Sequence, residues 1–254
     1  MLGRLFGRKK EKPATRQADF PWSNLTEAGA CNLAFGDLVN HATGFYFIEG
    51  RGPHAESTLA ALGAIAGMAA RVALFERIAS GERSPEGLNT ATLDDGRQFT
   101  FGDPLNLLLT QADPSIHSLG LWPVAAGATL QAGVAEHELP DLGEQFAIVT
   151  RRLGTPDEGW PDTPEGNRPA ASTHDILARV WPIAKTILTQ SYHDKPGPLG
   201  PAPLRLWPAI TTIAVSPILG RTAAVLDPRI GLAIVMQSAI YASKLDPAAL
   251  ETGS

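Results

Sequence analysis

The sequence feature that most constrains the fold is an apolar stretch from Leu59 to Phe75 whose only charged residue is Arg71. Its 17 residues fall short of the roughly 20 needed to cross a bilayer, so the pattern predicts a buried helix. A proline favours the first helical position and a glycine follows helix ends, so Pro53 and Gly81 predict a helix over 53–79. Because its apolar side chains cover nearly all sides, we expect this helix at the centre of the protein.

Two glycines, Gly63 and Gly67, are spaced so that they share one face of this helix. Glycine disfavours a helix interior, so its presence needs a packing reason. We predict that a second backbone packs closely against this face.

The remaining chain indicates more helices and little β-structure. The aromatic and β-branched run 45–48 predicts a short strand, and Asp95-Gly96 predicts the turn of a hairpin over 90–101. Apolar spacing indicates helices within 104–153 and 173–245. The fold class we predict is mainly α, with a helical bundle around helix 53–79 and a small antiparallel β element formed by 45–48 and 90–101.

Segment 154–171 interrupts the helical pattern with four prolines, three glycines and four acidic residues. A loop of this length is typically a lid, a binding loop or a linker. It separates an α+β part, 20–153, from a helical part, 172–254, and we expect the two parts to pack as one domain. Residues 1–19 are predicted to form a basic flexible tail.

Charge is distributed unevenly along the chain. The net charge is −5, but residues 1–16 hold six basic groups and one acid, so the rest carries −10. An acidic body argues against a nucleic-acid partner. The tail predicts a solvated terminus or, alternatively, a weak contact with a membrane surface. The sequence shows no signal peptide and its single cysteine excludes a disulfide framework, which favours a cytoplasmic location.

Segment 41–58 holds the strongest candidate site. Glycines precede a predicted helix start, where free N–H groups favour an anion, and Arg51 and Gly52 lie beside it. His54 and Glu56 are candidates for proton transfer, and His41 is a further candidate ligand-binding residue. Ordinary helix capping explains the same residues. No catalytic or metal-binding signature is present, and the sequence identifies no cofactor.

Two weaker patterns have structural and functional interpretations. Glu136-His137-Glu138 is either a solvated acidic turn or a metal-ligand group. Four of the five tryptophans precede proline, which predicts helix starts or, alternatively, one aromatic-lined pocket: Trp122, Trp160, Trp181 and Trp207.

These observations favour a non-catalytic binding or scaffold protein that self-associates as a homo-oligomer. This interpretation requires an exposed apolar patch on the helical part. The alternative is an enzyme or ligand-binding protein for a small anionic molecule, with its site at 50–56 and segment 154–171 as a lid.

Overall fold

A long helix, α2 (Ala55–Ala79), runs through the middle of the computed structural model, which describes residues 20–50, 52–94, 96–112, 119–192, 195–197 and 199–251. Every residue from Ser57 to Arg71 is buried. The predicted central helix is therefore confirmed, with its first residue two positions later than expected. By length and composition α2 would cross a membrane, but 89% of its most apolar window is buried inside the protein. Such burial is that of a core helix.

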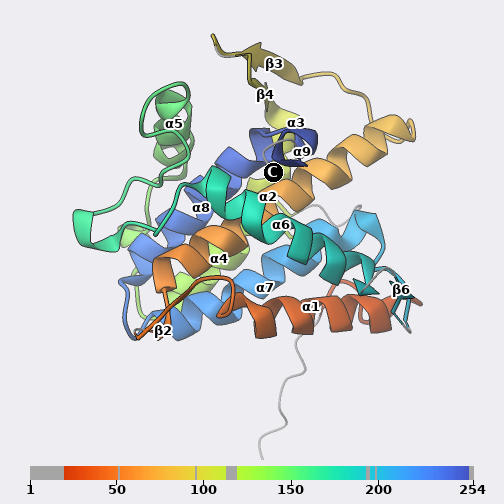
Figure 1. Cartoon of the computed structure of the whole chain (residues 1–254), viewed down its shortest axis with the longest axis horizontal. Helices are drawn as coiled ribbons and strands as arrows, with labels where there is room; N and C mark the ends of the chain where they lie inside the picture. The colour runs from red at the N-terminus through yellow and green to blue at the C-terminus, as the bar shows by residue number, and fades with distance from the viewer. Residues whose placement is uncertain are drawn as a thin grey trace, which may run out of the picture.

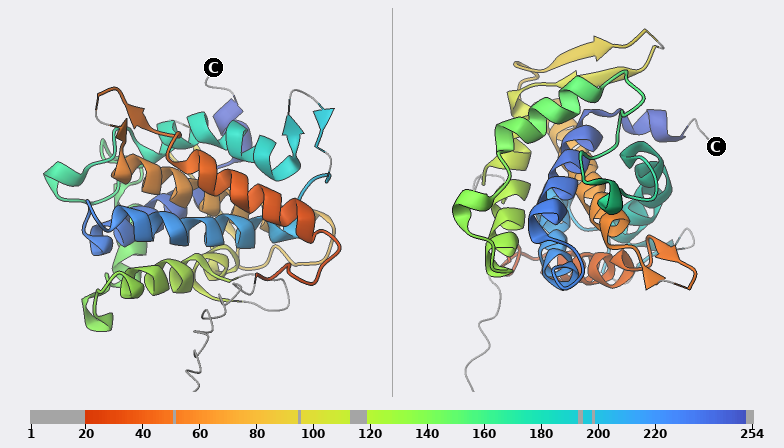
Figure 2. Two further views of the ribbon diagram at one scale, coloured as in Figure 1. Left: turned by 90° about the horizontal axis from the view of Figure 1, so that it is seen from below. Right: turned by 90° about the vertical axis from the view of Figure 1, so that its left-hand side faces the viewer.

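Four helices surround α2: α1 (Ala28–Ala42), α6 (Thr173–Thr189), α7 (Trp207–Thr222) and α8 (Pro228–Lys244) (Figures 1 and 2). The most extensive contact is with α8. A Cβ built on Gly63 would lie 2.3 Å from the Val235 carbonyl oxygen, and one on Gly67 would lie 2.1 Å from that of Ala239. The predicted close backbone approach is confirmed, and its partner is α8.

Shorter helices cover the rest of the core: α3 (Asp103–Thr110), α4 (Leu121–Gln131), α5 (Leu142–Arg152) and α9 (Pro247–Glu251). Single turns of 3-10 helix lie at Glu136–Glu138, Glu165–Asn167 and Leu204–Leu206. Side chains cap several helices. Asp141 accepts from the Glu144 amide at 2.7 Å, Ser172 from that of Asp175 at 3.2 Å, and Asp227 from that of Arg229 at 2.9 Å. These contacts satisfy backbone donors that have no partner within the helix.

The β-structure forms three separate two-stranded antiparallel sheets within the described residues. The predicted hairpin is present as β3 (Asn89–Thr92) and β4 (Gln98–Phe101), with Thr90 opposite Thr100. It stands at the edge of the helical body above α5 (Figure 2). A third pair, β5 (Ser191–Tyr192) and β6 (Lys195–Pro196), follows α6. Helix α6 ends at Thr189 because Gln190 adopts a left-handed conformation with φ of 53°.

The predicted strand at 45–48 is reduced to β1 (Phe47–Ile48), which pairs with β2 (Gly52–Pro53) and not with the hairpin. Gly50 and Gly52 have φ of 77° and 84°, a conformation that glycine adopts without a steric penalty, and this turn returns the chain to Phe47. Pro53 therefore lies in a strand. The expected N1 position was wrong, and His54 is the N-cap of α2.

Candidate functional site

The N-terminus of α2 brings together three of the side chains around the predicted site. The His54 ring Nδ1 lies 2.8 Å from Ser57 Oγ, and Nε2 lies 3.5 Å from Glu56 Oε2. Ser57 Oγ also accepts from the Ala170 amide at 2.8 Å. The serine, the histidine and the carboxylate thus form a chain of side-chain contacts, as the residues of a catalytic triad do.

The same contacts show that this group is a helix cap. Ser57 has no exposed surface, and its own amide donates to His54 Nδ1 at 3.4 Å. Glu56 Oε1 accepts from the Asn167 side chain at 3.2 Å. These bonds satisfy polar groups of the loop and of the start of α2. The Ser57 hydroxyl is therefore closed to substrate.

The other predicted site residues do not join this group. His41 is exposed on α1, where its Nδ1 bonds the Asp37 carbonyl at 2.8 Å on its own helix. Gly52 lies in β2. Arg51, like the tail 1–19, lies outside the described residues.

The metal and thiol candidates have structural explanations. Across the described part of the chain, no group of three or more His, Cys, Asp or Glu side chains is placed to hold a metal ion. Glu136–Glu138 is an exposed 3-10 turn whose Glu138 lies 3.6 Å from Arg229. Burial raises the pKa of the Cys31 thiol to about 11, so it is protonated and unreactive at neutral pH.

Segment 154–171 is tied to the helices along its whole length. Glu158 accepts from the Tyr241 hydroxyl at 2.9 Å and the Gly154 amide at 2.7 Å, and it forms an ion pair with Arg97. Further along, the Asp162 amide donates to Gln237 Oε1 at 2.6 Å. Together with the bonds from Asn167 and Ala170, these contacts fix the loop against α2 and α8.

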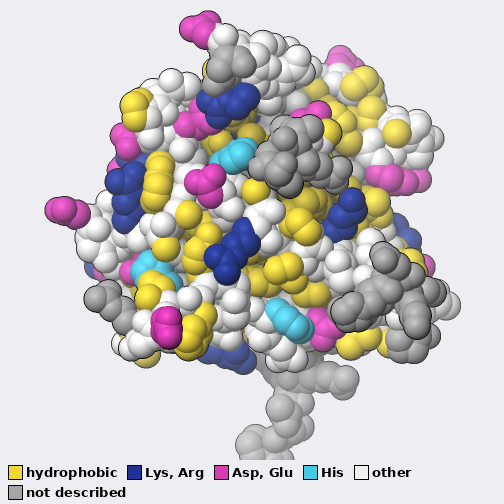
Figure 3. All heavy atoms as spheres, viewed as in Figure 1, with side chains coloured by type: hydrophobic (Ala, Val, Ile, Leu, Met, Phe, Trp, Pro, Cys, Tyr) yellow, Lys and Arg dark blue, Asp and Glu magenta, His cyan; other side chains and the backbone are white. Residues whose placement is uncertain are grey.

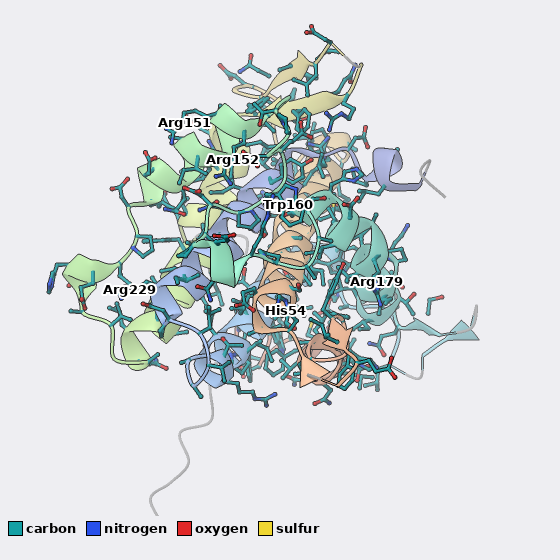
Figure 4. The ribbon with its side chains drawn as sticks, turned by 60° about the vertical axis from the view of Figure 1, so that its left-hand side comes forward. His54, Arg151, Arg152, Trp160, Arg179 and Arg229 are labelled. Carbon is teal, nitrogen blue, oxygen red and sulfur yellow. The ribbon has the colours of Figure 1, made fainter. Side chains whose placement is uncertain are left out.

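An open hollow of about 240 Å³ lies in the surface of this loop; we call it the Trp160 hollow. Its lining consists of Trp160, two arginines, three carboxylates and two smaller residues: Arg152, Asp157, Pro161, Asp162, Thr163, Glu165 and Arg168. Figure 4 shows Trp160 beside Arg152, with His54 further along the same side of the molecule. Five of the eight lining residues are charged, and Trp160 supplies the aromatic surface.

Each arginine of the hollow makes a different kind of contact. Arg152 donates to the Trp160 carbonyl at 2.8 Å and to Asp162 at 2.6 Å. The Arg168 guanidinium carbon lies 3.9 Å from the centre of the Trp160 ring, and its nearest carboxylate, Asp157, is 3.8 Å away. Arg152 is therefore part of the wall, whereas Arg168 lies on the aromatic surface.

On another side Trp160 borders a cavity of only about 10 Å³, shared with Thr173 and Tyr241. This space is close to that of one water molecule. The packing there leaves no room for a larger molecule.

The tryptophans do not form one shared pocket. Trp181 and Trp207 meet edge to face in the core at 6.3 Å between ring centres. The Trp207 indole donates to the Ala202 carbonyl at 3.0 Å. Trp160 alone among the tryptophans lines the hollow. Sequence reasoning missed this site, although it had identified both the tryptophan and the loop.

Compared with known proteins, the chain matches no family model, no curated protein and no solved structure.

Proposed function

We propose that this chain is a non-catalytic binding protein that takes up a small ligand in the Trp160 hollow. The observation that carries this proposal is an open space of about 240 Å³ on a loop that is already fixed against α2 and α8. Because the loop is ordered before the ligand arrives, binding avoids the entropy cost of ordering it. The volume lies below the range of about 300–1,000 Å³ for drug-sized ligands, so we expect a smaller molecule.

The anion site first expected at 50–56 has less support. Its histidine, glutamate and adjacent serine satisfy one another and the loop, as described above. Segment 154–171 does cover this end of α2, but as a fixed part of the structure. The Trp160 hollow offers side chains that still face open space.

The test follows the indole N–H signal of Trp160 by ¹⁵N NMR, assigned with a Trp160→Phe variant. Probes of different charge are titrated into the full chain: phosphate, succinate, methylguanidinium and glucose. Saturable movement of the Trp160 signal, with the other indole signals unmoved, is the expected result. If no probe moves this signal selectively, the hollow is not a binding site for these classes and the proposal fails.

Self-association through α6 is a second candidate function. Figure 3 shows hydrophobic side chains gathered around α6 on this face. Ile183 on α6 is 43% exposed, and Pro182 beside it is also at the surface. An exposed apolar area on the helical part is what a contact with a second copy of the chain needs.

Light scattering with size-exclusion chromatography tests this candidate. A dimer that Ile183→Asp converts to a monomer is expected, with Lys185→Asp, also exposed on α6, as a control for added charge. A wild-type monomer at high concentration contradicts it.

A cytoplasmic location belongs to the same proposal, because a lone buried thiol is compatible with a reducing compartment.

A further inference from the structure

The stacked pair of Arg168 and Trp160 indicates which ligand the hollow takes. The guanidinium carbon of Arg168 is 3.9 Å from the Trp160 ring centre. This places a cation over the negative face of an indole, which is the aromatic surface that attracts cations most strongly. Arg168 thus shows that the exposed face of Trp160 accepts a planar guanidinium.

Arg168 is held loosely in this position. Its only ion pair among the described residues is with Asp157 at 3.8 Å, and the two side chains are 51% and 62% exposed. Ion pairs this long and this exposed contribute little to stability. A competing cation therefore has to displace only this pair and the contact of Arg168 with the Trp160 ring.

The charges that would remain favour a cation. Without Arg168, the hollow holds the carboxylates of Asp157, Asp162 and Glu165 and one cation, Arg152, a formal charge of −2. Arg152 already bonds Asp162 and the Trp160 carbonyl, so it is not free to receive an anion. In addition, the buried Thr163 hydroxyl has no hydrogen-bond partner among the described residues. Residues 17–254 together carry a formal charge of −10, which attracts cations over a longer range.

We infer that the Trp160 hollow binds a guanidinium group of a small molecule, which replaces the Arg168 side chain on the indole ring. Trp160 supplies the stacking surface, and Asp157 and Glu165 supply acceptors. Arg168 occupies the site when the ligand is absent and so acts as an internal competitor. This inference rests on the proposed function of the hollow and adds the ligand class.

The experiment measures methylguanidinium binding to the full chain by the Trp160 indole signal. N-methylurea, which has the same shape without the charge, is the matched control ligand. We expect saturable binding of methylguanidinium and none of methylurea. Equal shifts with both ligands, or a response to phosphate alone, would overturn the ligand class while leaving a binding site at the hollow. If no probe moves the Trp160 indole signal, the proposed function is refuted as well.

Variants separate the internal competitor from a general effect of charge. Arg168→Ala removes the competitor and should tighten methylguanidinium binding about threefold or more, the scale of an exposed cation–π contact. Arg151→Ala is the matched control, because Arg151 is a neighbouring surface arginine that pairs with Glu144 at 2.7 Å and does not line the hollow. It should leave the affinity unchanged. Equal affinity in Arg168→Ala and the wild type would refute the competitor role.

Loss-of-binding variants complete the test. Asp157→Asn removes one acceptor from an exposed position and should weaken binding without unfolding the chain. Trp160→Leu should abolish methylguanidinium binding. Isothermal calorimetry measures this variant, because the reporter indole is lost. Undiminished methylguanidinium binding in Trp160→Leu would place the binding site elsewhere and overturn the inference.

Discussion

The Ala239 carbonyl oxygen of α8 lies where a Cβ at position 67 would need to be, only 2.1 Å from the ideal Cβ position on Gly67. No real Cβ contact is that short, so α2 and α8 can keep their present separation only with glycine at this position. The two helices form the most extensive contact in the core. One missing methyl group thus determines how closely the central pair of helices packs.

Gly67→Ala should lower the free energy of unfolding by about 2 kcal/mol or more, because overpacking forces the backbones apart. Gly36→Ala is the matched control, since Gly36 lies inside α1 and a Cβ there meets nothing within 4 Å. This control should raise stability by up to about 1 kcal/mol through helix propensity. Urea denaturation followed by circular dichroism measures both. Equal effects of the two variants would contradict the close approach.

Lys244 predicts a pH-dependent stability. Its side chain is 2% exposed, and its ammonium lies 4.6 Å from the centre of the Phe101 ring. Burial lowers the pKa of Lys244 to about 8 from 10.5. Between pH 8 and 10.5 the unfolded chain binds more protons than the folded chain. Stability should therefore rise as pH increases from 8 to 10.5, and this gain is lost as pH falls back to 8. The total change from this group is on the order of 3 kcal/mol.

Lys244→Met tests this because methionine keeps an unbranched side chain without the buried charge. The variant should be more stable than the wild type at neutral pH, and the difference should disappear above pH 10.5. Lys185→Met, at an exposed position on α6, is the control for the change of residue type. If the difference between Lys244→Met and the wild type is the same at every pH, folding does not shift the pKa of Lys244.

The central packing was predictable because its signal is local. The apolar run predicted α2, and the spacing of Gly63 and Gly67 predicted the close approach, since both follow from one helical repeat. Helix α1 escaped prediction although Cys31, Ala34 and Leu38 are spaced for one buried face. Two of these three residues are small, so the periodic contrast that marks an amphipathic helix is weak there.

The Trp160 hollow depends on contacts that no local pattern records. Asp162 is fixed by Gln237, 75 residues away, and Ala170 by Ser57, 113 residues away. Composition alone leaves the loop open to interpretation as a lid, a linker or a binding loop. The start of α2 was predicted two residues early for a simpler reason, since Pro53 suits a helix start as well as the strand that it occupies.

Glu158 links three parts of the protein, and its loss should release them together. Its side chain is 8% exposed and bonds Arg97 from the hairpin, Tyr241 from α8 and the Gly154 amide. Glu158→Ala leaves the Tyr241 hydroxyl buried without its acceptor and should lower the free energy of unfolding by about 2 kcal/mol. Urea denaturation measures this loss, and faster proteolysis within 154–171 should accompany it. Glu144→Ala removes an exposed ion pair with Arg151 and should change stability by less than about 1 kcal/mol. Comparable losses in both variants would show that Glu158 does not hold the loop.

The arrangement of Ser57, His54 and Glu56 should be inert toward reagents that acylate or phosphonylate active serines. Ser57 has no exposed surface, and its hydroxyl is engaged by His54 and by the Ala170 amide at 2.8 Å. A fluorophosphonate should leave the intact mass of the folded chain unchanged. His54→Ala should instead lower the free energy of unfolding by about 1 kcal/mol, the usual cost of losing an N-cap. Ser172→Ala removes the cap of α6 and calibrates that value in the same protein. A fluorophosphonate adduct mapped to Ser57 would mean that the loop opens over α2, and the alternative of an enzyme would then replace the cap as the explanation of these residues.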